Sequence, residues 1–250
     1  MSPGGDSSSA QLIERIHRMW VVASTARIAG EAGTARLSLP RIAARAGLRR
    51  KTVELMFGDV EGCLLETFDT AATLAAHRVI PRFAGEIGGA ERLREAVGAA
   101  MGFCQDEPEL ARVLCLDDPL LMSRRARMTT ALSAVIAGEF EEHTGRLETL
   151  AATAAVERTL MIVRGRLSEV PGAPYSEVGS EVLAALLTPF LGSAEARLQA
   201  ARPVETIRVA WEPATQNGKR PSLDVRLSAD LIRELARVWE PAPHEDDRDA

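Results

Sequence analysis

LSLPRIAARAGLRRKTVELMF, residues 37–57 of the chain, contains two short helical patterns that meet at a glycine. Ser38 is a residue type that caps helices at their N-terminus, and Gly47 permits the positive φ at which the first helix can end. A second helix is expected over residues 49–56, with Val53 turned toward the first helix. The spacing predicts a helix-turn-helix, a motif whose second helix lies in the major groove of DNA.

The charge of the same stretch supports contact with phosphate. Between Arg36 and Val53 there are six basic residues and no acidic one, although the chain as a whole carries a net charge of −5. The basic residues are Arg36, Arg41, Arg45, Arg49, Arg50 and Lys51. The negative total disfavours general polyanion binding, whereas a local basic patch is what phosphate contact requires. The alternative is a surface helical hairpin with a solvated basic face.

A further helix is expected to precede this motif. Apolar residues recur at helical spacing from about Ala10 to Gly30, whereas residues 1–9 are rich in Ser and Gly and are expected to be disordered. We expect Trp20 of this first helix to pack against the helix-turn-helix. Within the motif, Ala44 is expected to be small because the second helix crosses closely there.

The order of three motifs resembles the N-terminal domain of the tetracycline-repressor-like (TetR) family of transcriptional regulators. The motifs are ARIAGEAG at residues 26–33, SLPRIAARAGL at 38–48 and RRKTVELMFGDVEGCLLETF at 49–68. The resemblance is specific over residues 10–70 and extends to residue 200 as an all-helical layout. It implies a homodimeric, ligand-responsive transcriptional repressor that binds a pseudo-palindromic DNA operator.

An all-α fold in three parts follows from the residues and this resemblance. Residues 10–57 form a three-helix DNA-binding head, and residues 59–201 form a helical body for ligand binding and dimerisation. Residues 202–250 form a small C-terminal extension. Its alternating apolar residues around Asn217 and Gly218 predict a short β-hairpin, and Ser228 can cap a final helix before an acidic, disordered end.

The expected contacts with double-stranded DNA lie at the starts of the two helices of the motif. They are Ser38, Arg41, Arg49, Arg50, Lys51, Thr52, Glu54 and Leu55. The sequence departs from the family pattern where Glu54 and Leu55 replace an aromatic and a polar residue, and where Val60 replaces a lysine. These departures keep a second reading open: a helical interaction protein whose head has lost sequence-specific DNA recognition.

The family resemblance also implies a small-molecule effector in the body. Residues that could line its cavity are His77, Met101, Phe103, Met122, Met128 and Met161. Methionine at helical spacing also fills ordinary hydrophobic cores, so plain core packing is the alternative reading of these residues.

The last expected helix of the body, over residues 175–200, carries a strong apolar face. In the family the last two helices pair with their copies in a second subunit, which assigns this face to a homodimer interface. The interface residues are Val182, Leu183, Leu186, Leu187 and Phe190. The alternative is that they belong to the core of the single chain.

Composition supports a helical binding protein. Hydrophobic residues make up 46% of the chain and aromatic residues only 4%, which suits helices packed on helices. No motif for catalysis, a metal or a cofactor stands out, so no enzyme activity is expected. Cys63, Cys104 and Cys115 each lie in an apolar helical pattern and are expected to be reduced, buried thiols. We see no signal peptide and no membrane-spanning run, and therefore expect a cytoplasmic protein.

Overall fold

The computed structural model describes residues 5–84, 88–140, 146–169 and 175–208, and every regular element within these residues is helical. The helices are α1 (Gly5–Ala32), α2 (Leu39–Ala46), α3 (Arg50–Phe57), α4 (Val60–Val79), α5 (Gly89–Asp106), α6 (Pro108–Leu114), α7 (Met122–Gly138), α8 (Arg146–Glu169) and α9 (Tyr175–Ala200). Short 3-10 turns are η1 (Thr34–Arg36), η2 (Ile80–Ala84) and η3 (Pro119–Leu121). The predicted all-α class is confirmed. The predicted hairpin and final helix lie almost entirely within 209–250, outside the described residues.

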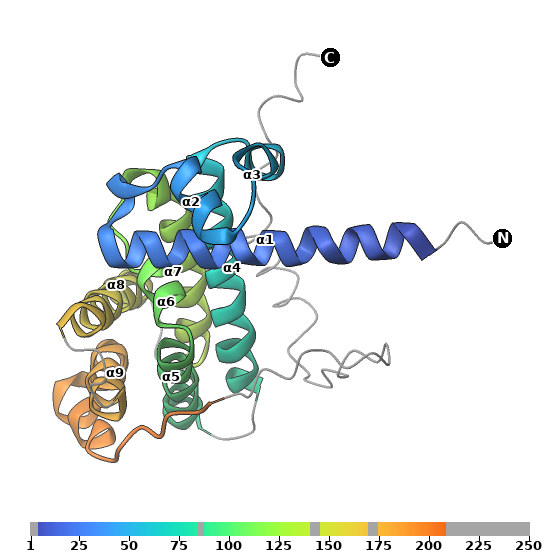
Figure 1. Ribbon diagram of the computed structural model, residues 1–250. Coiled ribbons are helices and arrows are strands. Elements are labelled where there is room, and N and C mark those ends of the chain that lie inside the picture. Colours follow the sequence, from blue (N-terminus) through green and yellow to red (C-terminus); the bar gives the residue numbers. More distant parts are fainter. Residues whose placement is uncertain (1–4, 85–87, 141–145, 170–174, 209–250) are drawn as a thin grey trace.

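Helix α1 separates the head from the body. It packs against α2 on one side and against α4 and α6 on the other. Figure 1 shows α2 and α3 above α1, the body below it, and the N-terminal part of α1 projecting beyond both. The recognition helix α3 therefore lies at the end of the molecule away from the body.

The helix-turn-helix forms as the sequence predicts. Gly47 ends α2 in the left-handed region at φ 67°, and the backbone N–H of Leu48 donates to the carbonyl oxygen of Ala43 at 2.9 Å. Val53 of α3 is fully buried. A separate small core joins α1, α2, α3 and the start of α4, and it includes Ile42 and Val53.

Three expectations for the head are wrong. Helix α1 begins at Gly5 rather than near Ala10, so residues 5–9 are helical. Ala44 faces solvent, and its neighbour Ala43 is the buried alanine at 3% exposure. Trp20 is 49% exposed beside His17, because Val21 and Thr25 carry the face of α1 that turns inward. Neighbouring positions in a helix point in different directions, so an error of one residue changes a buried side chain into an exposed one.

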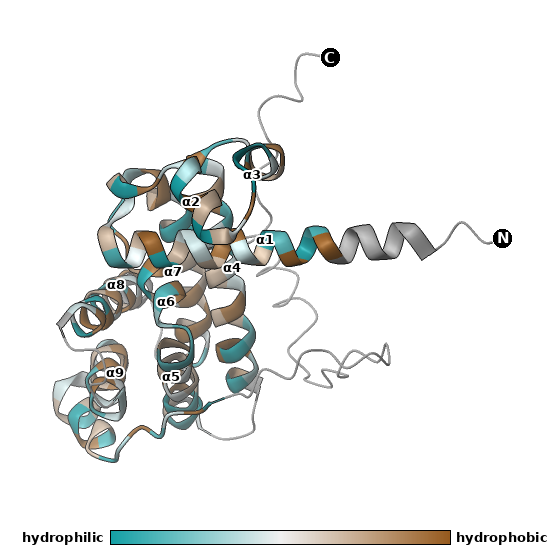
Figure 2. Cartoon of the chain, viewed as in Figure 1, coloured by the Kyte–Doolittle hydropathy of each residue, from teal (hydrophilic) through white to brown (hydrophobic). Residues whose placement is uncertain are grey.

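The body packs α4 to α9 around one larger apolar core. Hydrophilic and hydrophobic residues alternate along its helices, as Figure 2 shows, and the apolar faces are turned inward. After α9, residues 201–208 leave the helix and run back across α5, where Val204 is 1% exposed. We call residues 201–208 the strap. It is the orange segment below α5 in Figure 1.

Candidate functional site

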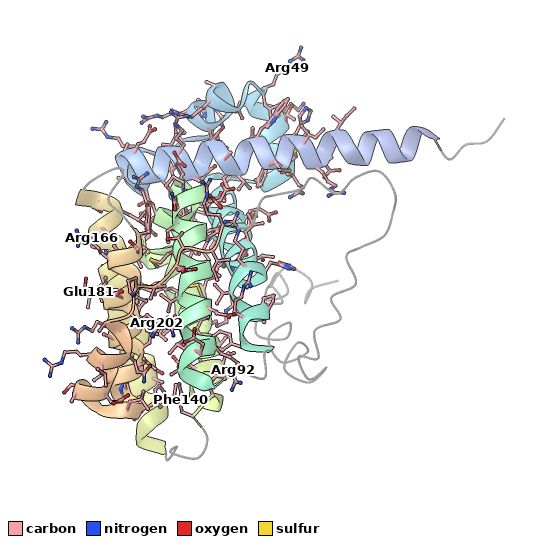
Figure 3. All side chains as sticks on the ribbon, turned by 90° about the horizontal axis from the view of Figure 1, so that it is seen from below. Arg49, Arg92, Phe140, Arg166, Glu181 and Arg202 are labelled. Atoms are coloured by element: carbon pink, nitrogen blue, oxygen red, sulfur yellow. The ribbon has the colours of Figure 1, made fainter. Side chains whose placement is uncertain are left out.

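The first turn of α3 presents basic side chains at the outer end of the head. Arg49 is the N-cap residue of α3, and Arg50 and Lys51 follow it in the first turn. All three are exposed, and Figure 3 shows Arg49 directed away from the body. A helix N-terminus attracts anions through its free N–H groups, and the basic side chains add positive charge at the same place.

The remaining predicted contacts are distributed around this turn. Leu55 is 78% exposed, and Thr52 is half-buried. Glu54 lies 3.9 Å from Arg50, one helical turn away, so its carboxylate reduces the positive potential of that arginine. At the start of α2, Arg41 is exposed and donates to the carbonyl oxygen of Arg36 at 3.4 Å. Ser38 occupies the predicted N-cap position, but its side chain makes no capping hydrogen bond.

Arg18 positions α3 and was not identified from the sequence. Its guanidinium lies over the ring of Phe57 at 5.2 Å and donates to the carbonyl oxygen of Met56 at 3.3 Å. It also lies 3.7 Å from Glu66 of α4. Arg18 thus ties the C-terminal end of α3 to both α1 and α4. A sequence signal for it is absent, because the three partners are 38 to 48 residues away along the chain.

Helix α4 belongs to both parts of the molecule. Asp59 caps its N-terminus by accepting from the N–H of Gly62 at 2.8 Å. Near that end Cys63 is buried in the head core, and one turn later Leu64 and Phe68 enter the body core. A movement of α4 in the body is therefore a movement of the floor of the head.

The body contains a cavity of about 170 Å³ with an apolar lining. Its walls come from α4 to α9 and from η2. Met101, Phe103 and Met128 are among the lining residues, as the sequence suggested. Other lining residues include Ala72, Ala75, Val79, Ala131, Leu160 and Leu186. The lining alanines leave space that larger side chains would fill.

Three residues expected at the cavity lie elsewhere. Met122 is 58% exposed, Met161 is 67% exposed, and His77 is also on the surface. Placement at the cavity is therefore corrected for these three. Helical spacing identified the elements that surround the cavity but not the face of each helix that turns toward it.

Two of the three cysteines line the cavity. Cys104 and Cys115 are both among its walls, and burial raises the pKa of each thiol well above its ordinary value. Cys63, in the head core, has its pKa raised to about 11 by burial, with Asp59 adding to the shift. All three are free thiols, and the high pKa keeps them protonated near neutral pH.

The end of α4 is held next to the cavity by a charged contact. Arg78 donates to Asp106 of α5 at 3.0 Å, and its guanidinium lies 5.5 Å from the ring centre of Phe103. Both side chains of the ion pair are mostly buried. Because Phe103 is a cavity wall, the cavity and the end of α4 share this contact.

The residues predicted to form the dimer interface are buried inside the single chain. Val182, Leu183, Leu186 and Leu187 are at most 6% exposed, and they pack in the body core. Phe190 stacks on Phe140, with ring centres 4.5 Å apart. The assignment of these five residues to an interface is therefore corrected. The apolar face of α9 turns inward because α9 packs against both α5 and α8.

Comparisons with known proteins bear on the fold. No protein-family model matches the sequence, and a comparison with curated proteins finds no match. Solved structures do match. The fatty acid degradation regulator FadR of Bacillus halodurans aligns with a TM-score of 0.56 and 16% identity, covering 69% of this chain and 94% of that one. The chain has the fold of the TetR-like transcriptional regulators.

Two further structures agree with the TetR-like fold. A TetR-like transcriptional regulator from Rhodococcus sp. RHA1 aligns with a TM-score of 0.56 and 17% identity, covering 70% of this chain and 96% of that one. FadR of Bacillus subtilis, solved in complex with stearoyl-CoA, aligns with a TM-score of 0.55 and 15% identity, covering 70% and 98%. At these identities the likeness concerns the fold and not the residues of a site.

Two other classes of site were sought in the part of the chain that the structure describes. There, no three or more His, Cys, Asp and Glu residues lie close enough together to hold a metal ion. None of the described helices is long and apolar enough to cross a membrane.

Proposed function

We propose that the protein is a DNA-binding transcriptional regulator that contacts DNA through the first turn of α3. The observation that carries this proposal is the exposed basic turn of Arg49, Arg50 and Lys51 on a helix-turn-helix at the outer end of the head. Arginine can read guanine through two hydrogen bonds, and lysine contacts phosphate as a point charge. The TetR-like fold supports the same role.

The decisive experiment is binding to the DNA that flanks the protein's own coding region, measured by fluorescence anisotropy over a range of salt. For Arg50→Ala/Lys51→Ala we expect binding weaker by at least about tenfold, and a salt slope reduced by about two. Thermal melting should be unchanged, because both side chains are exposed. The matched control is Arg27→Ala/Arg197→Ala, which removes two exposed arginines outside α3.

The same experiment separates this proposal from the alternative of an interaction protein without DNA recognition. If the double variant stays folded and binds DNA with the affinity and salt slope of the wild type, the recognition surface is assigned wrongly. If the wild type binds no DNA in the flanking region, the interaction protein is the better reading.

Glu54 is proposed to contribute specificity rather than affinity. A carboxylate is repelled by phosphate, but it can accept a hydrogen bond from the amino group of cytosine. Its 3.9 Å distance to Arg50 places both side chains on one exposed face of α3. Glu54→Ala should therefore relax the preference for one base pair, measured by competition between operator variants.

We propose that the regulator is a homodimer and that its interface is the outer face of α8 and α9. Leu150 and Met161 of α8 are 68% and 67% exposed, which is unusual for such residues on a free surface. The outward side of α8 also carries Arg158, while α9 exposes Glu177 and Glu181. Glu181 lies at the outer edge of the body in Figure 3. A two-fold axis would bring these opposite charges together.

Sedimentation analysis tests the dimer. The wild type should sediment as a dimer at micromolar concentration, and Met161→Arg should sediment as a folded monomer. A wild-type monomer under these conditions would contradict the proposal. Two heads on one dimer could then contact half-sites about one helical turn of DNA apart.

The cavity is proposed to hold a small apolar effector. A buried apolar cavity of roughly 150 Å³ is large enough for benzene, and this one, at about 170 Å³, is of similar size. A ring-sized molecule or the end of an alkyl chain fits this space. Fluorobenzene is a suitable probe, and its binding can be followed by fluorine NMR and by a rise in melting temperature.

Regulation is proposed to pass through α4. The cavity is lined by Ala72, Ala75 and Val79 of α4, and the same helix forms part of the head core through Cys63. An effector that binds one position of α4 better than another shifts the population between two head positions. Release of DNA by the effector would make the protein a ligand-responsive repressor acting in the cytoplasm. Weaker operator binding in the presence of the effector is the expected result.

A further inference from the structure

The strap lies against α5 in a way that depends on two glycines. The backbone N–H of Ile207 donates to the carbonyl oxygen of Gly98 at 3.0 Å. A Cβ atom added at Gly98 would lie 2.4 Å from the carbonyl oxygen of Glu205, and one at Gly102 would lie 1.9 Å from that of Ile207. Both distances are far below van der Waals contact. Only glycine at these two positions allows the strap to lie on the surface of α5.

The strap also lies directly behind the cavity wall. Val204 is 1% exposed, and it meets Met101 at Gly179 of α9: a Cβ atom there would lie 3.0 Å from Val204 and 3.3 Å from Met101. Met101 is one of the residues that line the cavity. Val204 therefore packs in the layer next to Met101, between the cavity and solvent.

The two ends of the strap are held with different strength. At its start, Arg94 is 7% exposed and donates to the carbonyl oxygens of Gln199 and Arg202. Charged hydrogen bonds made by a buried arginine are strong. At its far end, Arg208 donates to Asp106 at 2.8 Å, but the Arg208 side chain is 66% exposed. Exposed ion pairs contribute little to stability. The strap is therefore firmly fixed at Arg202 and weakly fixed at Arg208.

We propose that the strap is a removable wall of the apolar cavity, and that a ligand enters where it opens. The strap peels from Arg208 toward Arg202 and carries Val204 away from Met101. The walls of the cavity itself lie on helices and the η2 turn, and displacing a helix disrupts far more packing than lifting eight residues from a glycine surface. The importance of the opening rests on the proposed effector, but the opening itself can be measured without one.

The test uses the three buried thiols as reporters. Cys104 and Cys115 line the cavity, whereas Cys63 lies in the head core. In Gly102→Ala the new methyl group should displace the strap, while alanine favours the helical state of α5. Labelling by an uncharged maleimide, followed for each cysteine by peptide mass spectrometry, should become at least about tenfold faster at Cys104 or Cys115. The rate at Cys63 should not change.

Two further variants guard the interpretation. Gly165→Ala, in α8, adds a methyl group with nothing within 4 Å and should leave all three rates unchanged. Val204→Ser weakens the strap without altering α5 and should accelerate the same cavity thiols, which keeps the test valid if Gly102→Ala folds poorly. Hydrogen exchange at the Ile207 amide should rise in both strap variants, because its bond to Gly98 is lost.

The outcomes separate the strap from the rest of the proposed function. Faster exchange at Ile207 with unchanged labelling of Cys104 and Cys115 would overturn the proposal, and so would equal acceleration at all three cysteines. If the cavity thiols respond as expected but fluorobenzene does not bind the wild type, the strap stands and the effector proposal fails.

Discussion

The head and the body of this protein use apolar packing in different ways. The head has a small core made from α1, α2, α3 and the start of α4, and its working surface is a charged turn on the outside. The body has a much larger core, and its working surface is a cavity of about 170 Å³ inside it. In the head, packing fixes the position of an external helix; in the body, incomplete packing creates the site.

This difference determines how each part responds to mutation. A tightly packed small core has little room for added volume, whereas a core with a cavity has space to fill. Exposed charges on the head can be removed without unfolding it, but apolar residues around the cavity contribute to stability and binding together. Function and stability are therefore separable in the head and linked in the body.

The largest expected effect concerns α9 as part of the body core. Leu187 is fully buried, so Leu187→Arg places an unpaired charge inside the body and should cost more than about 4 kcal/mol. Circular dichroism melting should show an unfolded or aggregated protein. Leu198→Arg on the same helix is the control, because Leu198 is 68% exposed and its replacement should leave melting nearly unchanged. Equal tolerance of both variants would mean that α9 does not belong to the core.

The second prediction compares one substitution in both parts. Ala43 of the head core and Ala131 of the cavity wall are 3% and 6% exposed. Ala43→Leu should destabilise the protein by about 1–3 kcal/mol through overpacking. Ala131→Leu should fill the cavity, stabilise the protein by about 0.5–2 kcal/mol and weaken fluorobenzene binding. Urea unfolding measures both changes, and a common sign would remove the distinction between the two cores.

The smallest effect concerns the buried thiols at alkaline pH. The ordinary thiol pKa of 9.0 is raised to about 11 for Cys63 in the head and to about 12 for Cys115 in the body. An unfolded chain loses these protons first, so the stabilisation is complete below pH 9 and is lost as pH rises toward the folded pKa. The loss should be on the order of 1 kcal/mol per pH unit for each thiol. Cys63→Ala and Cys115→Ala should each lose less stability than the wild type between about pH 8 and about pH 10. An identical pH slope in all three proteins would contradict the assignment.

Local signals in the sequence were sufficient for the helix-turn-helix. The positive φ at Gly47, the buried Val53 and the exposed basic turn after Arg49 all follow from residues within a few positions of one another. Capping, glycine conformation and helical spacing act over such short distances. For that reason the all-α class and the placement of α3 could be stated before any coordinates were known.

Orientation within the helices was decided only by tertiary packing. The apolar face of α9 was read as a surface for a second subunit, but α5 and α8 cover Leu183 and Leu187 within the same chain. Met122 and Met161 were placed at the cavity, yet both face solvent. An apolar stripe shows that a helix face is covered, but not which element covers it.

What the sequence by itself determined is the set of helices, the turn that joins α2 to α3, and the chemistry that α3 presents. What only the tertiary structure decided is the cavity, the clamp of Arg18 on Phe57, and the seat of the strap on Gly98 and Gly102. The physical reason is range. Caps, turns and charge patterns are properties of neighbouring residues, whereas a cavity or a backbone crossing exists only after residues about a hundred positions apart have met.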